Sequence, residues 1–183
     1  MIKLDLYGKI VLLCLVRFVK KRERFVKVKL SSVVENIEVH DSEFESQIFF
    51  DKQTYSFVYI TEEALRKAED GGAYDHLPDW EQEEWKQAEI VVDDKEEKRF
   101  VLLPEKRDLD DYSIMEDFSF SIKDKKVKEK LLRAIRGRGA FRRFRVQVED
   151  SGLLEDWYKY RDFKHLQFAK EWCEEEGISF YEE

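Results

Sequence analysis

The sequence has few of the residues that usually bring chemistry to a protein. Its two cysteines, Cys14 and Cys173, lie at opposite ends of the 183 residues and form no CxxC pair. This spacing argues against a disulfide framework and a zinc ribbon, and it favours reduced thiols in a cytoplasm. The three histidines, His40, His76 and His165, are dispersed, and none occurs in an HxxxH or HExxH motif. The sequence therefore predicts no metal site.

Motifs for phosphate binding and for nucleophilic catalysis are also missing. The GRGAF stretch at residues 137–141 lacks the Lys-Ser/Thr pair of a P-loop and does not follow a predicted strand. Cys173 precedes three glutamates, whose charge raises the pKa of a thiol and makes it a poor nucleophile. We therefore predict no catalytic residue and no cofactor. A metal-dependent hydrolase is an alternative, because Mg²⁺ needs only one or two carboxylates.

No apolar run is long enough to span a membrane. Ile10–Val16 is apolar throughout, but a transmembrane helix needs about 20 such residues. Asp5 before this run and the basic residues after it do not fit a secretory signal peptide. We interpret residues 1–24 as an N-terminal extension that forms either a buried strand or a docking element. As a docking element it would allow a homo-oligomer to form.

The small number of proline and glycine residues argues against a linker between domains. The chain contains two prolines and seven glycines, and 43% of its residues are hydrophobic, which favours one folded core although 40% are charged. We predict that residues 25–183 form a single α+β domain, mostly helical, with a small antiparallel sheet. The hairpin of this sheet is predicted at Gln47–Phe50 and Tyr55–Ile60.

Further elements follow from local signals. Short strands are predicted at residues 26–30 and 100–103. The predicted helix caps are Ser31 or Ser32, Thr61, Asp79, and Asp110 or Asp111.

Residues 131–160 contain the densest helix signals of the chain. Gly137 and Gly139 end one predicted helix, a second runs from Ala140 to Gly152, and a long third helix opens at Leu154. Because Phe141 and Phe144 are three residues apart, we place them on one buried face. The alternative is that they are exposed and stack on nucleic-acid bases. The predicted core of this region consists of Leu131, Ile135, Phe141, Phe144, Trp157 and Trp172.

Charge is strongly segregated along the chain. Residues 61–98 contain 14 acidic and 5 basic residues, residues 121–145 contain 2 acidic and 11 basic, and residues 149–183 contain 11 acidic and 4 basic. In one interpretation the basic segment pairs with the two acidic segments inside the fold. In the other, its arginines stay free and bind an anionic partner beside the glycine turn. The candidate binding residues are Arg136, Arg138, Arg142, Arg143 and Arg145.

These arginines are not expected to be equally available. Arg138 lies between two glycines and Arg142 is directed away from the predicted apolar face, so both should be accessible to a partner. Arg143 and Arg145 are expected to pair with Glu149 or with the acidic C-terminal helix.

Three functions are compatible with this pattern. The first is a non-catalytic regulatory or interaction protein that engages a nucleic acid or a nucleoprotein through the arginine-rich turn. The second is an acidic inhibitor that binds and blocks a nucleic-acid-processing protein. The third is the metal-dependent hydrolase.

Several stretches of the chain occur together in one known family. Over about residues 26–178 the sequence resembles a bacterial family recorded only as an uncharacterised protein family (UPF). The matching stretches are KVKLSSVVENIE, FVYITEEALRKAEDG, LPDWEQEEW, YSIMEDF, LLRAIRGRGAFRRFR, WYKYRD and AKEWCEEEGI. The resemblance implies a small, soluble, cytoplasmic protein and assigns no activity. Such proteins begin near the KVKL motif, so residues 1–24 look like an addition.

Overall fold

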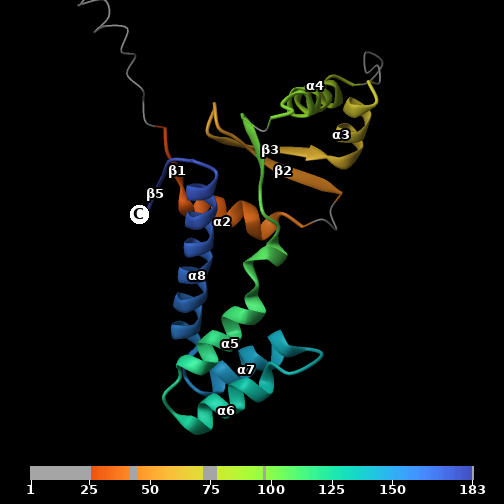
Figure 1. Ribbon diagram of the computed structural model, residues 1–183. Coiled ribbons are helices and arrows are strands. Elements are labelled where there is room, and N and C mark those ends of the chain that lie inside the picture. The colour runs from red at the N-terminus through yellow and green to blue at the C-terminus, as the bar shows by residue number, and fades with distance from the viewer. Residues whose placement is uncertain (1–25, 42–44, 72–77, 97, 183) are drawn as a thin grey trace, which may run out of the picture.

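The computed structural model describes residues 26–41, 45–71, 78–96 and 98–182. Two lobes lie at the two ends of a long helix, α8 (Leu154–Glu175), and both pack against it (Figure 1). With 22 residues, α8 is about 33 Å long. One lobe contains the strands and the other contains only helices, so the prediction of a mostly helical α+β fold is confirmed.

A three-stranded antiparallel sheet forms the centre of the first lobe. Its strand order is β3 (Ser56–Thr61), β2 (Ser46–Asp51) and β4 (Phe100–Leu102), which confirms the predicted hairpin and third strand. Side chains alternate between the two faces of the sheet. Phe50 and its neighbours face α2 (Leu30–Val39) and α8, whereas Ile60 packs against α3 (Glu62–Glu69) and α4 (Asp79–Asp93).

A second, two-stranded sheet joins the two ends of the described chain. In it β1 (Val28–Lys29) pairs in parallel with β5 (Phe180–Tyr181), and Val28 N–H donates to the Ser179 carbonyl at 3.0 Å. The strand near residue 28 was predicted, but its partner was not. Because α2 starts directly after β1, Ser31 and Ser32 lie inside the helix, and their prediction as caps was wrong.

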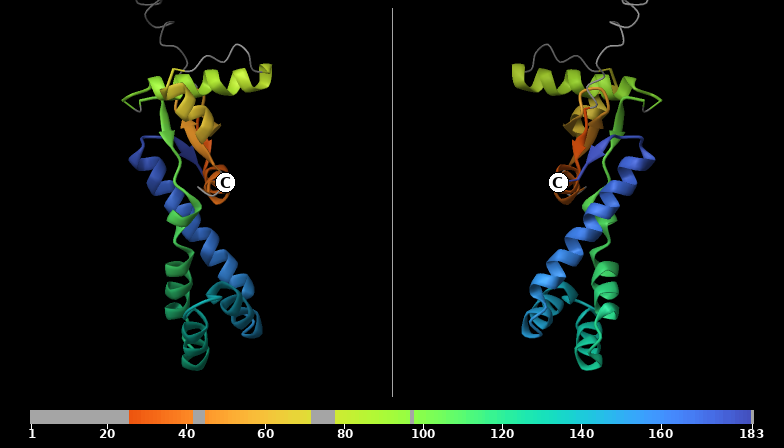
Figure 2. Two further views of the ribbon diagram at one scale, coloured as in Figure 1. Left: turned by 90° about the vertical axis from the view of Figure 1, so that its right-hand side faces the viewer. Right: turned by 90° about the vertical axis from the view of Figure 1, so that its left-hand side faces the viewer.

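The second lobe packs three helices around the first half of α8. These are α5 (Asp111–Ser121), α6 (Lys125–Ala134) and α7 (Ala140–Asp150), and a short 3₁₀ helix, η2 (Lys106–Leu109), leads into α5. Their core includes Leu131, Ile135, Phe144 and Trp157, as predicted. Figure 2 shows this lobe at the opposite end of the molecule from α4.

Side-chain caps define the starts of several helices. Thr61 accepts a hydrogen bond from the Ala64 amide at 3.2 Å, and Asp110 accepts one from the Ser113 amide at 3.2 Å, so both predicted caps are confirmed. The prediction of Asp79 as a cap was wrong by one residue, because α4 begins at Asp79 and Pro78 occupies the capping position.

Two predicted core residues lie elsewhere. Trp172 packs in the core of the sheet lobe, where its ring centroid lies 6.3 Å from that of Phe50. Phe141 is 58% exposed. The buried stripe of α7 passes through Ala140, Phe144 and Val148, four residues apart, and Phe141 lies at the edge of that stripe in the first turn of the helix. The prediction of Phe141 as a core residue was wrong, because Ala140 is the buried residue of that turn and Phe141 lies beside it, exposed to solvent.

None of the helices in the described ranges is long and apolar enough to cross a membrane. The predictions for residues 1–24 concern a segment outside the described residues and stay predictions.

Candidate nucleic-acid interface

The turn between α6 and α7 is built on glycine and projects from the side of the helical lobe (Figure 1). Ile135 is 2% exposed and anchors the turn in the core. Gly137 and Gly139 then adopt φ values of +74° and +79°, which residues other than glycine rarely adopt. A Cβ atom at Gly139 would lie 3.2 Å from Nη1 of Arg143, a tight contact that the guanidinium would have to relieve by moving.

Arg143 holds the turn together. Its Nε donates to the Ala134 carbonyl at 3.1 Å, and Nη2 donates to the Arg136 carbonyl at 2.6 Å. Further hydrogen bonds run from the same guanidinium to the carbonyls of Gly137 and Arg138. Ala134 is the last residue of α6 and the other three residues follow it, so these carbonyls have no partner inside that helix and Arg143 acts as a side-chain cap. The prediction that Arg143 pairs with Glu149 or the last helix was wrong.

The four other predicted arginines are exposed around this turn. Within the described part of the chain, none of their side chains takes part in a hydrogen bond or an ion pair; they are Arg136, Arg138, Arg142 and Arg145. Arg145 therefore does not form the predicted pair with Glu149 or the last helix. The interpretation that the acidic segments neutralise these arginines internally does not describe this fold.

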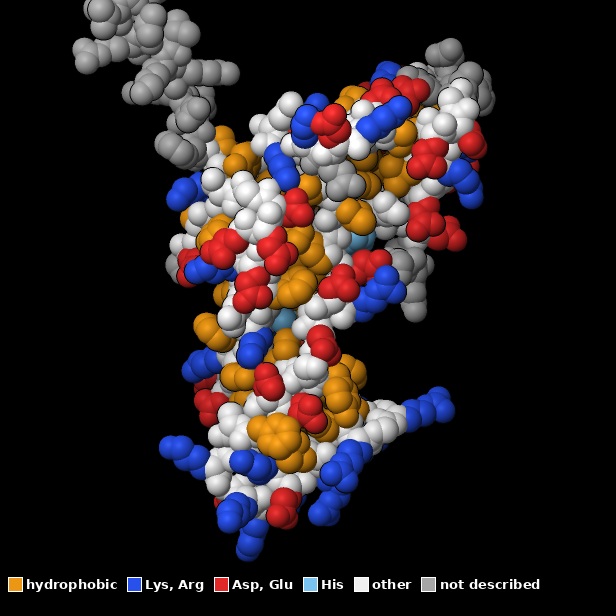
Figure 3. All heavy atoms as spheres, in the orientation of Figure 1, with side chains coloured by type: hydrophobic (Ala, Val, Ile, Leu, Met, Phe, Trp, Pro, Cys, Tyr) orange, Lys and Arg blue, Asp and Glu red, His pale blue; other side chains and the backbone are white. Residues whose placement is uncertain are grey.

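A groove between α6 and α7 extends the basic surface. Its volume is about 530 Å³, and its lining residues are Lys130, Arg133, Ala134, Arg142, Arg143, Val146 and Gln147. No acidic residue is among them. We use the term arginine surface for the four free arginines together with Lys130 and Arg133. Figure 3 shows lysine and arginine side chains gathered over this end of the molecule.

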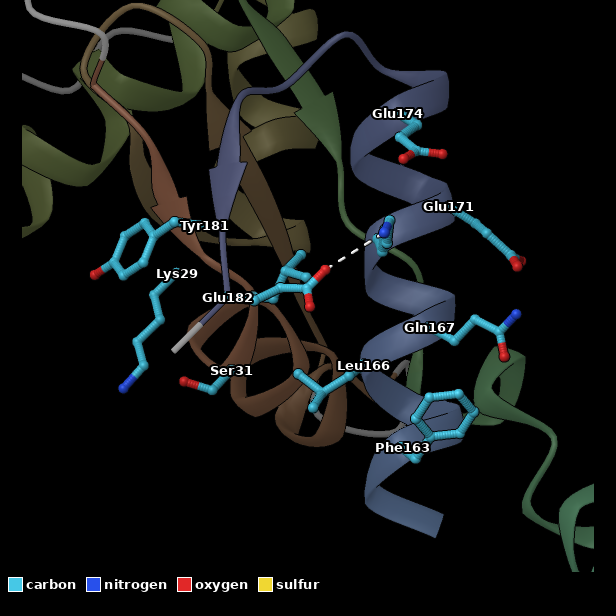
Figure 4. Close-up of a pocket in the computed structure, with 11 residues that line it drawn as sticks. Lys29, Ser31, Phe163, Leu166, Gln167, Glu171, Glu174, Tyr181 and Glu182 are labelled. Carbon is cyan, nitrogen blue, oxygen red and sulfur yellow. Dashed lines mark hydrogen bonds and ion pairs between the residues drawn. The ribbon is translucent and has the colours of Figure 1, made fainter. Parts of the chain in front are cut away.

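A second cavity, the α8 groove, lies between α8, β5 and the start of α2. Its volume is about 500 Å³, and Leu30, Phe163, Leu166 and Tyr181 contribute apolar lining. Figure 4 shows Leu166 extending from α8 toward Ser31. Lysines and glutamates both line the groove, so its charge favours neither anions nor cations. The sequence did not indicate this groove, because it depends on the unpredicted pairing of β5 with β1.

His165 occupies the junction of the two lobes and was not singled out from the sequence. Its ring is 3% exposed, with Nε2 2.9 Å from Asp111 Oδ1 and Nδ1 3.3 Å from Glu38 Oε1. The hydrogen bond from His165 lowers the pKa of Asp111 and outweighs the opposing effect of burial. Because the carboxylates bind opposite ring nitrogens, the three groups do not converge on one metal ion.

Among the residues that the structure describes, the other potential reactive groups do not form a site with the arginines. Cys173 is buried, and burial together with the charge of Glu174 raises the pKa of its thiol to about 12. This agrees with the prediction that it is a poor nucleophile. His40 is buried and its Nδ1 lies 3.0 Å from the Pro104 carbonyl oxygen, whereas His76 falls outside the described residues.

Comparison with known proteins identifies a family but no characterised relative. No curated protein and no solved structure matches the chain. A family model described as "Uncharacterised protein family (UPF0158)" matches residues 41–183, most of the span over which the sequence motifs resemble such a family. The chain therefore belongs to the uncharacterised protein family UPF0158.

Proposed function

We propose that this protein is a non-catalytic interaction protein that binds a nucleic acid, free or within a nucleoprotein, through the arginine surface. The observation that carries the proposal is the set of four exposed arginines without a partner in the described chain. A guanidinium offers a planar set of donors that suits phosphate oxygens, and such contacts are strong when both groups are charged. These arginines can bind phosphate without first breaking an internal ion pair.

The composition of the surface supports binding rather than catalysis. Residues 131–145 contain no aspartate, glutamate, histidine or cysteine. This stretch therefore supplies neither a general base nor a carboxylate that would hold a metal ion beside a bound phosphate. Binding is the chemistry that its donors supply.

The charge distribution of the whole chain supports an oriented approach to a polyanion. The net charge is −8, yet residues 121–145 alone carry 11 basic and 2 acidic residues. A polyanion is repelled by the sheet lobe, which contains the acidic segment of residues 61–98, and attracted by the arginine surface on the other lobe. The acidic excess thereby limits binding to one end of the protein.

Charge reversal tests the proposal. The variant Arg138→Glu/Arg142→Glu should weaken binding to a fluorescently labelled oligonucleotide about tenfold or more, measured by anisotropy at low salt. Its melting temperature should stay close to that of the wild type, because neither side chain has an intramolecular partner in the described chain.

The matched control is Lys86→Glu/Lys95→Glu. Both lysines are exposed and lie in or just after α4, at the opposite end of the molecule, and the net charge changes by the same amount. The control should bind like the wild type. Equal weakening in the two variants would mean that net charge alone decides binding, and unchanged binding in the arginine variant would move the interface away from the arginine surface. In that case binding to a basic protein would favour the acidic-inhibitor alternative.

A further inference from the structure

We propose that the nucleic acid is single-stranded and that an unpaired base stacks on Phe141. This inference rests on the proposed function and names the class of nucleic acid that the arginine surface prefers. The ring of Phe141 is 58% exposed in the first turn of α7, at the edge of the arginine surface.

The position of Phe141 on α7 places it among cationic groups. Arg145 is four residues further on and therefore lies beside Phe141 on the same flank of the helix. Arg142 follows Phe141 in the sequence and lines the groove shared with α6. Arg138 lies in the turn just before the helix starts. A strand that crosses the start of α7 can therefore meet guanidinium groups on both sides of the ring.

The fold does not depend on this ring. Phe141 is absent from the core of the helical lobe, which the same helix supplies through Phe144 and Val148. Leaving a phenylalanine exposed gives up the stabilisation that burial of its ring would provide. An exposed ring among unpaired arginines is therefore better explained by contact with a partner than by folding.

The ring also discriminates between single and double strands. In a duplex, each base is stacked on its neighbours and its faces are covered, so only phosphates are available to the arginine surface. In a single strand, a base can leave the stack and lie on an aromatic ring while the adjacent phosphates bind arginine. Duplex binding would use the arginines and leave Phe141 without a contact.

The test compares three probes of equal length: a single-stranded oligonucleotide, its duplex, and an abasic strand that has phosphates but no bases. The wild type should bind the base-containing single strand about fivefold or more tightly than the abasic strand, because base–aromatic stacking contributes on that scale. Phe141→Leu should remove this preference and leave binding to the abasic strand and the duplex unchanged. Phe141→Trp should retain the preference.

Phe163→Leu is the matched control, because Phe163 is 61% exposed but lies on α8, outside the arginine surface. It should leave binding to all three probes unchanged. If the wild type binds none of them, the proposed function fails as well. If Arg138→Glu/Arg142→Glu weakens binding while Phe141→Leu does not, the proposed function stands and single-strand preference through Phe141 is wrong. Equal weakening of all three probes by Phe141→Leu would also contradict stacking.

Discussion

Two adjacent arginines on α7 have different roles. The guanidinium of Arg143 donates to the carbonyls of Ala134, Arg136 and Gly137 at the end of α6, and these hydrogen bonds hold it against the turn. Arg142 is equally part of the basic sequence run, but no side-chain partner is described for it. The linear pattern could not separate these roles, because they depend on how the glycine turn folds back over the start of α7.

Substituting each arginine separately should separate stability from binding. Arg143→Met should lower the melting temperature by about 2–4 °C, the effect of losing about 1 kcal/mol in a protein of this size. Arg142→Met should leave the melting temperature unchanged and weaken binding to a polyanion. Thermal denaturation and anisotropy measure the two effects, and equal melting temperatures for the two variants would show that Arg143 is not a cap.

Two phenylalanines on the same helix provide a second contrast. The ring of Phe144 is 1% exposed, and its centroid lies 4.9 Å from that of Trp157 and 6.4 Å from that of Phe118. Phe144→Ala should therefore lower the free energy of unfolding by about 3–5 kcal/mol. Phe141→Ala should change it by no more than about 0.5 kcal/mol, as expected at an exposed position. Urea unfolding of the two variants measures the difference, and similar losses would place Phe141 in the core after all.

At the scale of the elements, what could be predicted from the sequence was local. Thr61 and Asp110 cap helices through hydrogen bonds to amides three residues away, and the strands of the hairpin are joined by only a few residues. Gly137 and Gly139 supply the backbone conformations that end one helix and begin the next. Signals of this kind lie within one turn or one hairpin, so a short stretch of sequence contains all of the relevant residues.

What could not be predicted depends on distant residues. β5 forms because Phe180 meets Val28, and nothing near either residue indicates the other. His165 looks like an isolated histidine until folding brings α2 and α5 to α8. For the candidate interface, the sequence predicted the four free arginines but not Arg133, which lines the groove. Only the packed helices separate Arg143 from the free arginines and leave Phe141 outside the core.

The contact between Asp111 and His165 gives α5 and α8 a pH-dependent link. The pKa of Asp111 lies below its ordinary value of 3.8 in the folded protein, first because of the hydrogen bond from His165. A carboxyl group with a lowered pKa stabilises the fold above its ordinary pKa, and that stabilisation is lost as the pH falls through the lower, folded-state pKa. The contribution is therefore complete at neutral pH.

Asp111→Asn should remove this contribution. The variant should be less stable than the wild type at pH 7, and the two should converge as the pH falls from about 5 to about 2. Urea unfolding across this range gives both curves. Curves that remain parallel throughout would show that Asp111 does not titrate with a lowered pKa in the folded protein.

At the scale of the whole molecule, α8 separates two surfaces of opposite character. Its last half packs in the sheet lobe, near the acidic segment that contains α3 and α4, and its first half packs in the lobe that carries the arginine surface (Figures 1 and 2). One end of the protein is therefore strongly basic although the net charge of the whole chain is −8. Folding keeps the acidic segment that contains α3 and α4 away from that end (Figures 1 and 2).

The most direct test of this account is the salt dependence of binding to a single-stranded oligonucleotide. Each phosphate that is neutralised contributes about −0.7 to the slope of log K against log salt concentration, so the four free arginines should give a slope of about −2 to −3. Arg138→Ala/Arg142→Ala should make the slope less negative by about 1.4. A wild-type slope near zero, or a slope that the double variant leaves unchanged, would contradict the claim that these arginines bind phosphate.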